Sequence, residues 1–88
     1  MRLISDHIMK KVQGDVVLVP ISGAETDFRG MLVLNRTGAA LCSMLQQDID
    51  RESLIAGLAR EYGTEPEQVE TDVDAFLSQL DSCHMLIH

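Results

Sequence analysis

The chain has few aromatic residues, cysteines and basic residues, and each shortage excludes a class of protein. Its 88 residues include no tryptophan, and aromatic residues make up only 3% of them. A core built from Leu, Val, Ile and Met can fold a chain of this length, but it leaves little to line a deep cofactor pocket as well. We therefore expect one small domain over residues 1–88, with no cofactor.

Cysteine and histidine are also scarce. Cys42 and Cys83 lie far apart in no CxxC spacing, so they predict neither a disulfide framework nor a metal knuckle. His84 and His88 are four residues apart, but the apolar residues between them favour a strand or a tail over a metal-binding helix. We expect no metal site.

Long apolar runs are missing as well. No stretch approaches the roughly 20 residues that a membrane-spanning helix needs. The first residues do not follow the charged-then-apolar pattern of a signal peptide, because Asp6, His7, Lys10 and Lys11 interrupt it. We expect a cytoplasmic protein with no membrane partner.

Basic residues are few and unevenly placed. Seven Lys and Arg face fourteen Asp and Glu, and only Arg51 and Arg60 lie after residue 36, among ten acids. A polyanion would be repelled by that second part, so nucleic acid is not an expected partner. The acids that crowd residues 65–74 are typical of a solvated face at a helix N-terminus.

Familiar catalytic motifs are not found. The sequence has no glycine-rich phosphate loop, no GxSxG elbow and no HExxH pair. Carboxylates without a pocket do not make an active site, and we expect no enzyme activity.

The first third has the alternation of β-structure. Apolar and β-branched residues predict strands over residues 7–13, 16–21 and 28–34. Gly14-Asp15 is the expected turn and residues 22–27 the longer loop, which together predict an antiparallel meander. Pro20 cannot donate to a ladder, so it should lie at an edge or a strand end.

After Asn35 the apolar period becomes 3.6, which predicts three helices within residues 37–82. Thr37 is the expected N-cap of the first helix, and Asp50 that of the second, which Gly63 should end. Thr64 and Glu67 predict a capping box for the third. Residues 85–87 suit a short strand or a packed tail. The expected fold is α+β, a three-stranded antiparallel sheet followed by a three-helix bundle.

Three segments together carry a family resemblance. They are MLVLNRTGAA at 31–40, LIAGLAREYG at 54–63 and VETDVDAFLSQL at 69–80. In order and spacing this sequence resembles the PqqD-like family, the peptide chaperone domains also called RiPP recognition elements, over residues 31–87. It departs from the family where many members have a bulky aromatic residue, at Cys42 or Ser43, and where many have glycine after the last helix.

The resemblance implies a winged helix-turn-helix-like domain that binds the leader segment of a ribosomally made precursor peptide. The domain then presents that peptide to a modifying enzyme, often a radical SAM enzyme. In the family the leader lies between the third strand and the third helix. The positions expected to bind it here are Arg29, Met31, Val33, Asp72, Val73, Phe76, Gln79 and Leu80.

These positions have alternative interpretations. Val73, Phe76 and Leu80 also suit a simple core stripe, and the sequence does not show whether Met31 and Val33 face the helices. Asp72 suits a leader Lys or Arg, or water.

Other classes share some of these features. A winged-helix DNA-binding regulator would need a basic third helix, and this one is acidic. An acyl-carrier-like acidic protein would need an Asp-Ser-Leu site, for which Glu52-Ser53-Leu54 is a poor match. An open strand edge also allows a homodimer.

Overall fold

The computed structural model describes residues 1–21 and 30–88. The expected loop 22–27 and the first two positions of the expected strand 28–34, Arg29 among them, lie outside the described residues. In chain order the elements are β1 Arg2–Leu3, β2 His7–Val12, β3 Asp15–Pro20, β4 Leu32–Leu34, α1 Arg36–Met44, α2 Arg51–Tyr62, α3 Pro66–Ser82 and β5 Leu86–Ile87.

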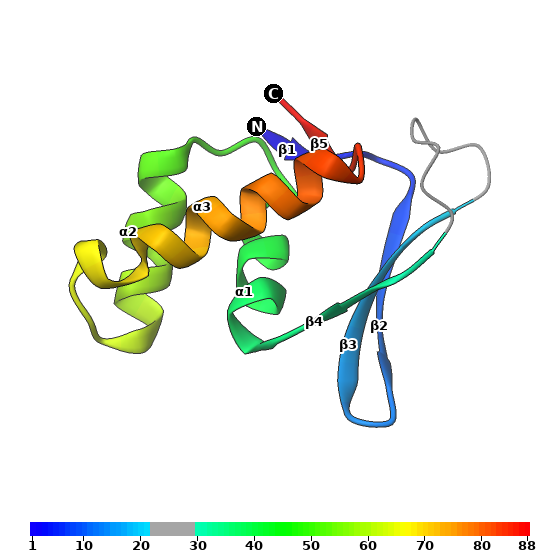
Figure 1. Ribbon diagram of the computed structural model, residues 1–88, viewed down its shortest axis with the longest axis horizontal. Helices are drawn as coiled ribbons and strands as arrows, with labels where there is room; N and C mark the ends of the chain where they lie inside the picture. The colour runs from blue at the N-terminus through cyan, green and yellow to red at the C-terminus, as the bar shows by residue number, and fades with distance from the viewer. Residues whose placement is uncertain (22–29) are drawn as a thin grey trace.

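The first layer is an antiparallel sheet in the order β2-β3-β4, which confirms the predicted meander. The β2–β3 hairpin extends away from the helices, and β4 leads directly into α1 (Figure 1). The turn is Gln13-Gly14 and not the predicted Gly14-Asp15. Both turn residues have positive φ, 53° and 89°, as a two-residue hairpin turn of the primed type requires.

Pro20 is the last residue of β3, at a strand end as predicted. β3 is the central strand, but its pairing with β4 ends at Leu18 and Leu32. Pro20, which has no N–H, therefore removes no hydrogen bond from the β3–β4 ladder.

The helices begin close to their predicted positions, with two corrections. Asn35, not Thr37, caps α1, because its side chain accepts a hydrogen bond from the Gly38 N–H at 2.7 Å. Asp50 caps α2 as predicted. The capping box of α3 lies one residue later than predicted, on Glu65 and Gln68, since Pro66 then occupies the first helical position.

Gly63 ends α2 in the left-handed conformation, at φ 61°. Its N–H bonds back to the carbonyls of Ala59 and Arg60, so the chain can reverse into α3. The sequence predicted this end correctly.

A second sheet joins the two ends of the described chain. β1 pairs with β5, and the ends of the ribbon lie side by side (Figure 1). Leu3 N–H also donates to the Leu45 carbonyl at 3.0 Å, and Ile4 N–H to the Met85 carbonyl at 2.9 Å. β1 was not predicted, because two residues are too short to show a period.

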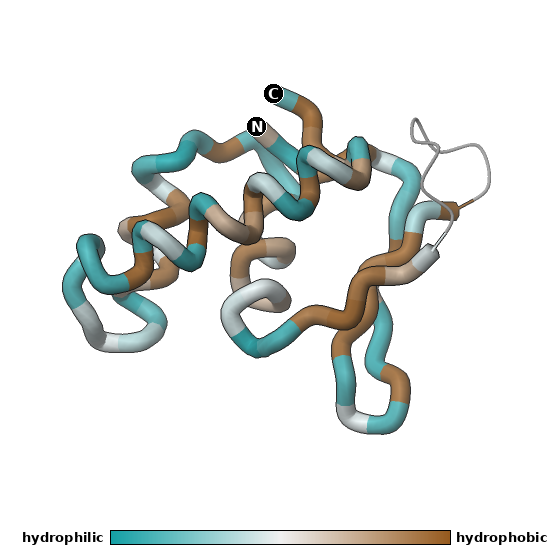
Figure 2. Tube along the Cα trace, viewed as in Figure 1, coloured by the Kyte–Doolittle hydropathy of each residue, from teal (hydrophilic) through white to brown (hydrophobic). Residues whose placement is uncertain are grey.

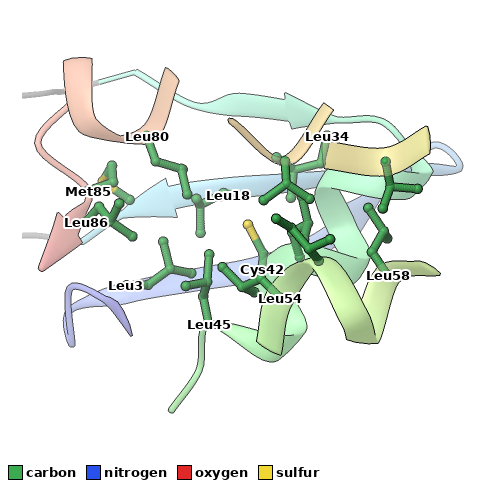
Figure 3. Packing of buried hydrophobic residues seen from close by; sticks show 14 of the residues in the cluster. Leu3, Leu18, Leu34, Cys42, Leu45, Leu54, Leu58, Leu80, Met85 and Leu86 are labelled. Carbon is green, nitrogen blue, oxygen red and sulfur yellow. The ribbon is translucent and has the colours of Figure 1, made fainter. Parts of the chain in front are cut away.

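One hydrophobic core joins these layers. Apolar residues follow β3, β4 and one face of each helix (Figure 2). The core side chains that Figure 3 labels are Leu3, Leu18, Leu34, Cys42, Leu45, Leu54, Leu58, Leu80, Met85 and Leu86. Each fully buried leucine contributes roughly 1.5–3 kcal/mol. As the sequence suggested, this core is almost entirely aliphatic. Across the described part of the chain, no helix is both long and apolar enough to span a bilayer.

Candidate functional site

The outer edge of β4 has no partner strand within residues 1–21 and 30–88, because the sheet ends there. β4 has only three residues, Leu32–Leu34, and none of them is charged. Leu34 is buried and Leu32 half-buried against the core. Met31 and Val33 are 59% and 62% exposed, so they belong to the sheet face turned away from the helices. The sequence had left this orientation open.

The hydrogen bonds of the β2–β3 hairpin show which backbone groups of β3 face β4. Val12 and Asp15 close the two-residue turn and so form a hydrogen-bonded pair. Beyond the other end of the hairpin, Ile21 N–H donates to the Asp6 carbonyl at 3.1 Å. Hydrogen-bonded and non-hydrogen-bonded pairs alternate along an antiparallel ladder, so the two ends of the hairpin give the same assignment. The odd-numbered residues of β3 bond to β2, and the even-numbered ones face β4.

This alternation also assigns the backbone groups of β4. Val16 pairs with Leu34, and Leu18 pairs with Leu32. Leu32 and Leu34 therefore direct their N–H and C=O groups toward β3. Val33 lies between them and directs its own N–H and C=O to the unpaired edge. A peptide that adds to this sheet would bond to Val33.

A pocket lies between the start of α1 and the middle of α3. Its volume is about 240 Å³. Three of its lining residues, Asp72, Phe76 and Gln79, were predicted as leader-binding residues, and their spacing of four and three places them on one face of α3. The structure brings these three together.

Three further residues complete the lining of this pocket, Asn35, Thr37 and Ala75. The sequence analysis did not assign them to the site. A signal was present, since Asn35 directly follows the predicted docking strand and a cap residue presents its side chain at a helix end.

Two predicted leader-binding residues belong instead to the core. Val73 and Leu80 are both 0% exposed, so no peptide can touch them in this structure. They lie one position after Asp72 and Gln79 and turn inward because the helix period rotates them away from the pocket. The alternative interpretation as core residues holds for both. Phe76 is only partly buried and reaches the core and the pocket.

The ring of Phe76 lies on the first turn of α1. A Cβ added at Gly38 would be 3.1 Å from Cε1 of this ring and 3.1 Å from Oδ1 of Asn35. An alanine here would require the ring or the Asn35 side chain to shift by a few tenths of an ångström. The ring and the N-cap of α1 therefore define the pocket wall together.

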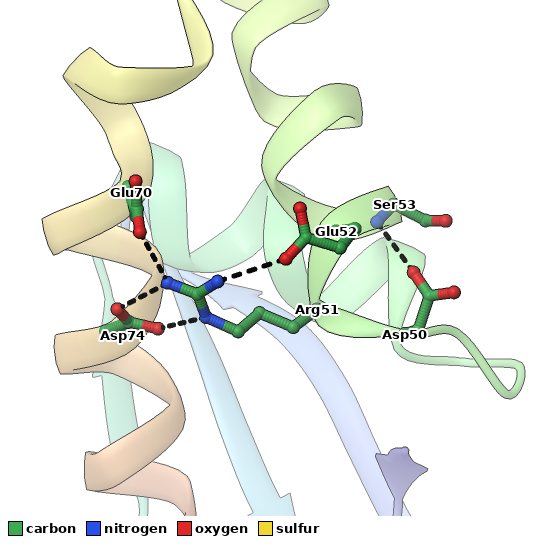
Figure 4. A network of polar contacts seen from close by, with 6 residues as sticks. All are labelled: Asp50, Arg51, Glu52, Ser53, Glu70 and Asp74. Atoms are coloured by element: carbon green, nitrogen blue, oxygen red, sulfur yellow. Dashed lines mark hydrogen bonds and ion pairs between the residues drawn. The ribbon is translucent and has the colours of Figure 1, made fainter.

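An ion-pair network holds α3 against the start of α2 (Figure 4). The Arg51 guanidinium donates to both carboxylate oxygens of Asp74 at 2.8 Å and to Glu70 at 2.8 Å. These hydrogen bonds hold the pKa of the Asp74 carboxyl below its usual range. Such a two-pronged contact fixes geometry as well as charge, and so it helps to set the position of the helix that carries the pocket.

Larger hollows lie elsewhere, one of about 300 Å³ between α1 and α2 and two of about 430 Å³. Of the latter two, one lies along α1 near Tyr62 at the end of α2, and the other on the outer face of the sheet near Met31. None of these hollows adjoins α3. The 240 Å³ pocket begins at Asn35, directly after β4, and also borders α3, so an extended segment on the unpaired edge of β4 could reach both.

Comparisons with known proteins give the family. The sequence matches the family model for "Coenzyme PQQ synthesis protein D (PqqD)" over residues 15–86, which is most of the chain. A solved structure described as "TbiB1 in Complex with the TbiA(beta) Leader Peptide" has the same fold, with a TM-score of 0.74 and 21% sequence identity over 98% of this chain and 94% of that one. No curated protein matches. The match to the family model shows that the chain belongs to the PqqD family.

Proposed function

We propose that this chain is a peptide chaperone that binds the leader segment of a ribosomally synthesised precursor and presents it to a modifying enzyme. The leader would pair with the unpaired edge of β4 as an added strand and place side chains along α3. Membership of the PqqD family supports this role. So does the TbiB1 structure, whose description names a bound leader peptide.

The backbone of Val33 carries the argument. Its N–H and C=O face an edge with no partner strand in the part of the chain that the structure describes. Unpaired backbone groups on a strand edge are the usual template for strand addition. Main-chain hydrogen bonds would supply affinity, and the pocket on α3 would supply selectivity.

The chemistry would belong to the partner enzyme, for which the radical SAM class is our proposal. Burial raises the pKa of the Cys42 thiol to about 12, so this cysteine is not a ready nucleophile. A chaperone of newly made peptides belongs in the cytoplasm, and we propose that location. We propose that residues 1–88 form one domain, because β1 and β5 pair with each other and pack on the same hydrophobic core.

Amide hydrogen exchange, followed by NMR, tests the docking edge. The probes are peptides selected from a displayed library of short random sequences for binding to the immobilised protein. On binding, the Val33 amide should become protected, whereas Leu32 and Leu34 are already protected by β3. The opposite edge provides the control, and the Lys11 amide there should keep exchanging. Protection on the β2 edge alone, or selection of no binding peptide, would overturn the proposal.

The partner class needs a separate test. The genes beside the one that encodes this chain should include a short peptide and a radical SAM enzyme. The purified enzyme should modify the peptide at a higher rate when this chain is added. A neighbouring modifying enzyme of another class, stimulated in the same way, would remove the radical SAM assignment and leave the peptide-binding role intact.

A further inference from the structure

Glu67 and Asp72 are the two acids of α3 that make no ion pair within the described residues, and of these two Asp72 lines the 240 Å³ pocket. Glu70 and Asp74 bind Arg51, and Asp81 lies 3.0 Å from Nε2 of His88. Asp72 makes no hydrogen bond or ion pair to any part of the chain that the structure describes, although it lines the 240 Å³ pocket. Its charge is therefore available to a ligand.

The neighbours of Asp72 in the pocket suit a cation. Phe76 lines the same cavity, and a cation near an aromatic face is attracted to it. The side-chain amide of Gln79 also has no partner within the described residues, and its oxygen can accept a hydrogen bond. Among residues 1–21 and 30–88, no Lys or Arg lines the pocket.

The volume of the pocket and the negative charge around it both favour a basic side chain as the ligand. A pocket of about 240 Å³ is smaller than the roughly 300–1,000 Å³ of a typical small-molecule site, so it suits one side chain better than a whole cofactor. Residues 37–88 contain ten acids and two bases, and the resulting negative field attracts cations and disfavours acidic side chains.

We propose that this pocket takes a Lys or Arg side chain of the docked peptide, held by the Asp72 carboxylate over the Phe76 ring. This specificity rests on the proposed peptide-binding function. A guanidinium fits the pair best, because it stacks on a ring and bonds a carboxylate with two parallel N–H groups. Asp72 is then the residue that selects a leader with a basic position.

Small probes test the pocket without any peptide. The probes are N-acetyl-arginine methylamide, N-acetyl-lysine methylamide and, as controls, the leucine and glutamate equivalents. In an NMR titration the two basic probes should shift the amides of Thr37, Asp72 and Phe76, with a Kd of about 1–10 mM. The acidic probe should not. Equal shifts with all four probes, or none with the basic ones, would overturn the proposal.

A charge-matched pair of variants gives the second test. Asp72→Asn should weaken the arginine probe about five- to tenfold. Glu67→Gln removes the same charge from the same helix outside the pocket, so it should leave binding within about twofold. A similar loss of affinity in both variants would mean that the overall negative charge of the protein, and not the pocket, attracts the probe. That result would overturn the proposal.

Selected peptides separate this proposal from the one on which it rests. Peptides chosen on the unmodified protein should share a Lys or Arg at one position, and those chosen on Asp72→Asn should lose that preference. Peptides that protect Val33 but show no basic position would refute the basic-side-chain pocket while the peptide-binding function stands. If no peptide protected Val33 but the arginine probe still shifted the pocket amides, the strand-addition proposal would be refuted and the pocket for a basic side chain would stand.

Discussion

In the part of the chain that the structure describes, the β2-β3-β4 sheet has two edges without a partner strand, and they differ in length, charge and surroundings. β2 is six residues long and carries Lys10 and Lys11, and its far half projects into solvent with the hairpin turn. β4 has three residues and no charge, and it leads into the helix that forms one wall of the pocket.

Charged residues on an exposed strand discourage pairing with other chains. The β2 edge is protected in this way, whereas the β4 edge is not. The difference favours β4 over β2 as the docking edge, because no charge opposes pairing there and α3 lies close enough to contact side chains of an added strand.

The largest expected effect concerns how β4 is held. Leu34→Ala should lower the free energy of unfolding by about 2–4 kcal/mol, because it removes a buried side chain from the core. Val33→Ala changes the exposed face of the same strand and should cost under about 0.5 kcal/mol. Urea unfolding measures both. Similar losses in the two variants would mean that the outer face of β4 also contributes to stability, although the Val33 side chain is exposed.

Proline substitution compares the two edges directly. Val33→Pro removes an N–H that faces the unpaired side of β4 and places a ring there, so peptide affinity should fall at least about tenfold. Lys11→Pro is the matched control, because the same alternation directs the Lys11 N–H to the free side of β2. Its affinity should stay within about twofold.

Calorimetric titration with a library-selected peptide measures both proline variants, and circular dichroism checks that each remains folded. If Lys11→Pro abolished binding and Val33→Pro did not, the peptide would be docking on the protected edge, and the comparison would be reversed.

The sequence predicted the parts of this arrangement that depend on period and caps. The meander, Asp50 and Gly63 follow from alternation and cap chemistry, and the face of α3 with Asp72, Phe76 and Gln79 follows from a spacing of four and three. Turn position was missed by one residue, because both Gln13-Gly14 and Gly14-Asp15 contain the glycine that such a turn favours.

Other features depend on packing, which the sequence alone does not show. Val73 and Leu80 share the apolar stripe of α3 with Phe76, and only the tertiary structure decides which of them the core covers completely. The orientation of Met31 and Val33 depends on strand register, since a shift of one residue would exchange the two faces. Arg29 lies outside the described residues, so its assignment to the leader stays a prediction.

A smaller effect is expected at Gly38 of α1, which lies against the Phe76 ring of α3. Gly38→Ala gains helix propensity of up to about 1 kcal/mol, but its Cβ crowds both Asn35 and the Phe76 ring. We expect these terms to offset each other, leaving stability within about 1 kcal/mol while displacement of the ring lowers peptide affinity about threefold.

Gly57→Ala is the control for Gly38→Ala. Its Cβ would meet the flexible Met44 side chain, on the α1–α2 side and away from the pocket. Peptide affinity should not change there. Equal affinity in both variants would show that the Phe76 ring does not form the pocket wall during binding.

The smallest expected effect is the acid sensitivity of the α3 anchor. Hydrogen bonds from Arg51 lower the pKa of Asp74, so this carboxylate stabilises the fold fully above its unfolded pKa of about 3.9. The stabilisation is lost as the pH falls through the lower, folded pKa, because the unfolded state takes up the proton first. Asp74→Asn should therefore flatten the loss of stability below about pH 4 and change little at pH 7 beyond a small constant decrease.

Urea midpoints from pH 6 down to about pH 3 measure this. Glu67→Gln, which breaks no ion pair among the described residues, should keep the slope of the parent protein. If the Asp74→Asn slope equalled that of the parent, Arg51 would not be holding α3 in solution. The α3 wall of the 240 Å³ pocket would then be mobile, and a peptide would have to order α3 on binding.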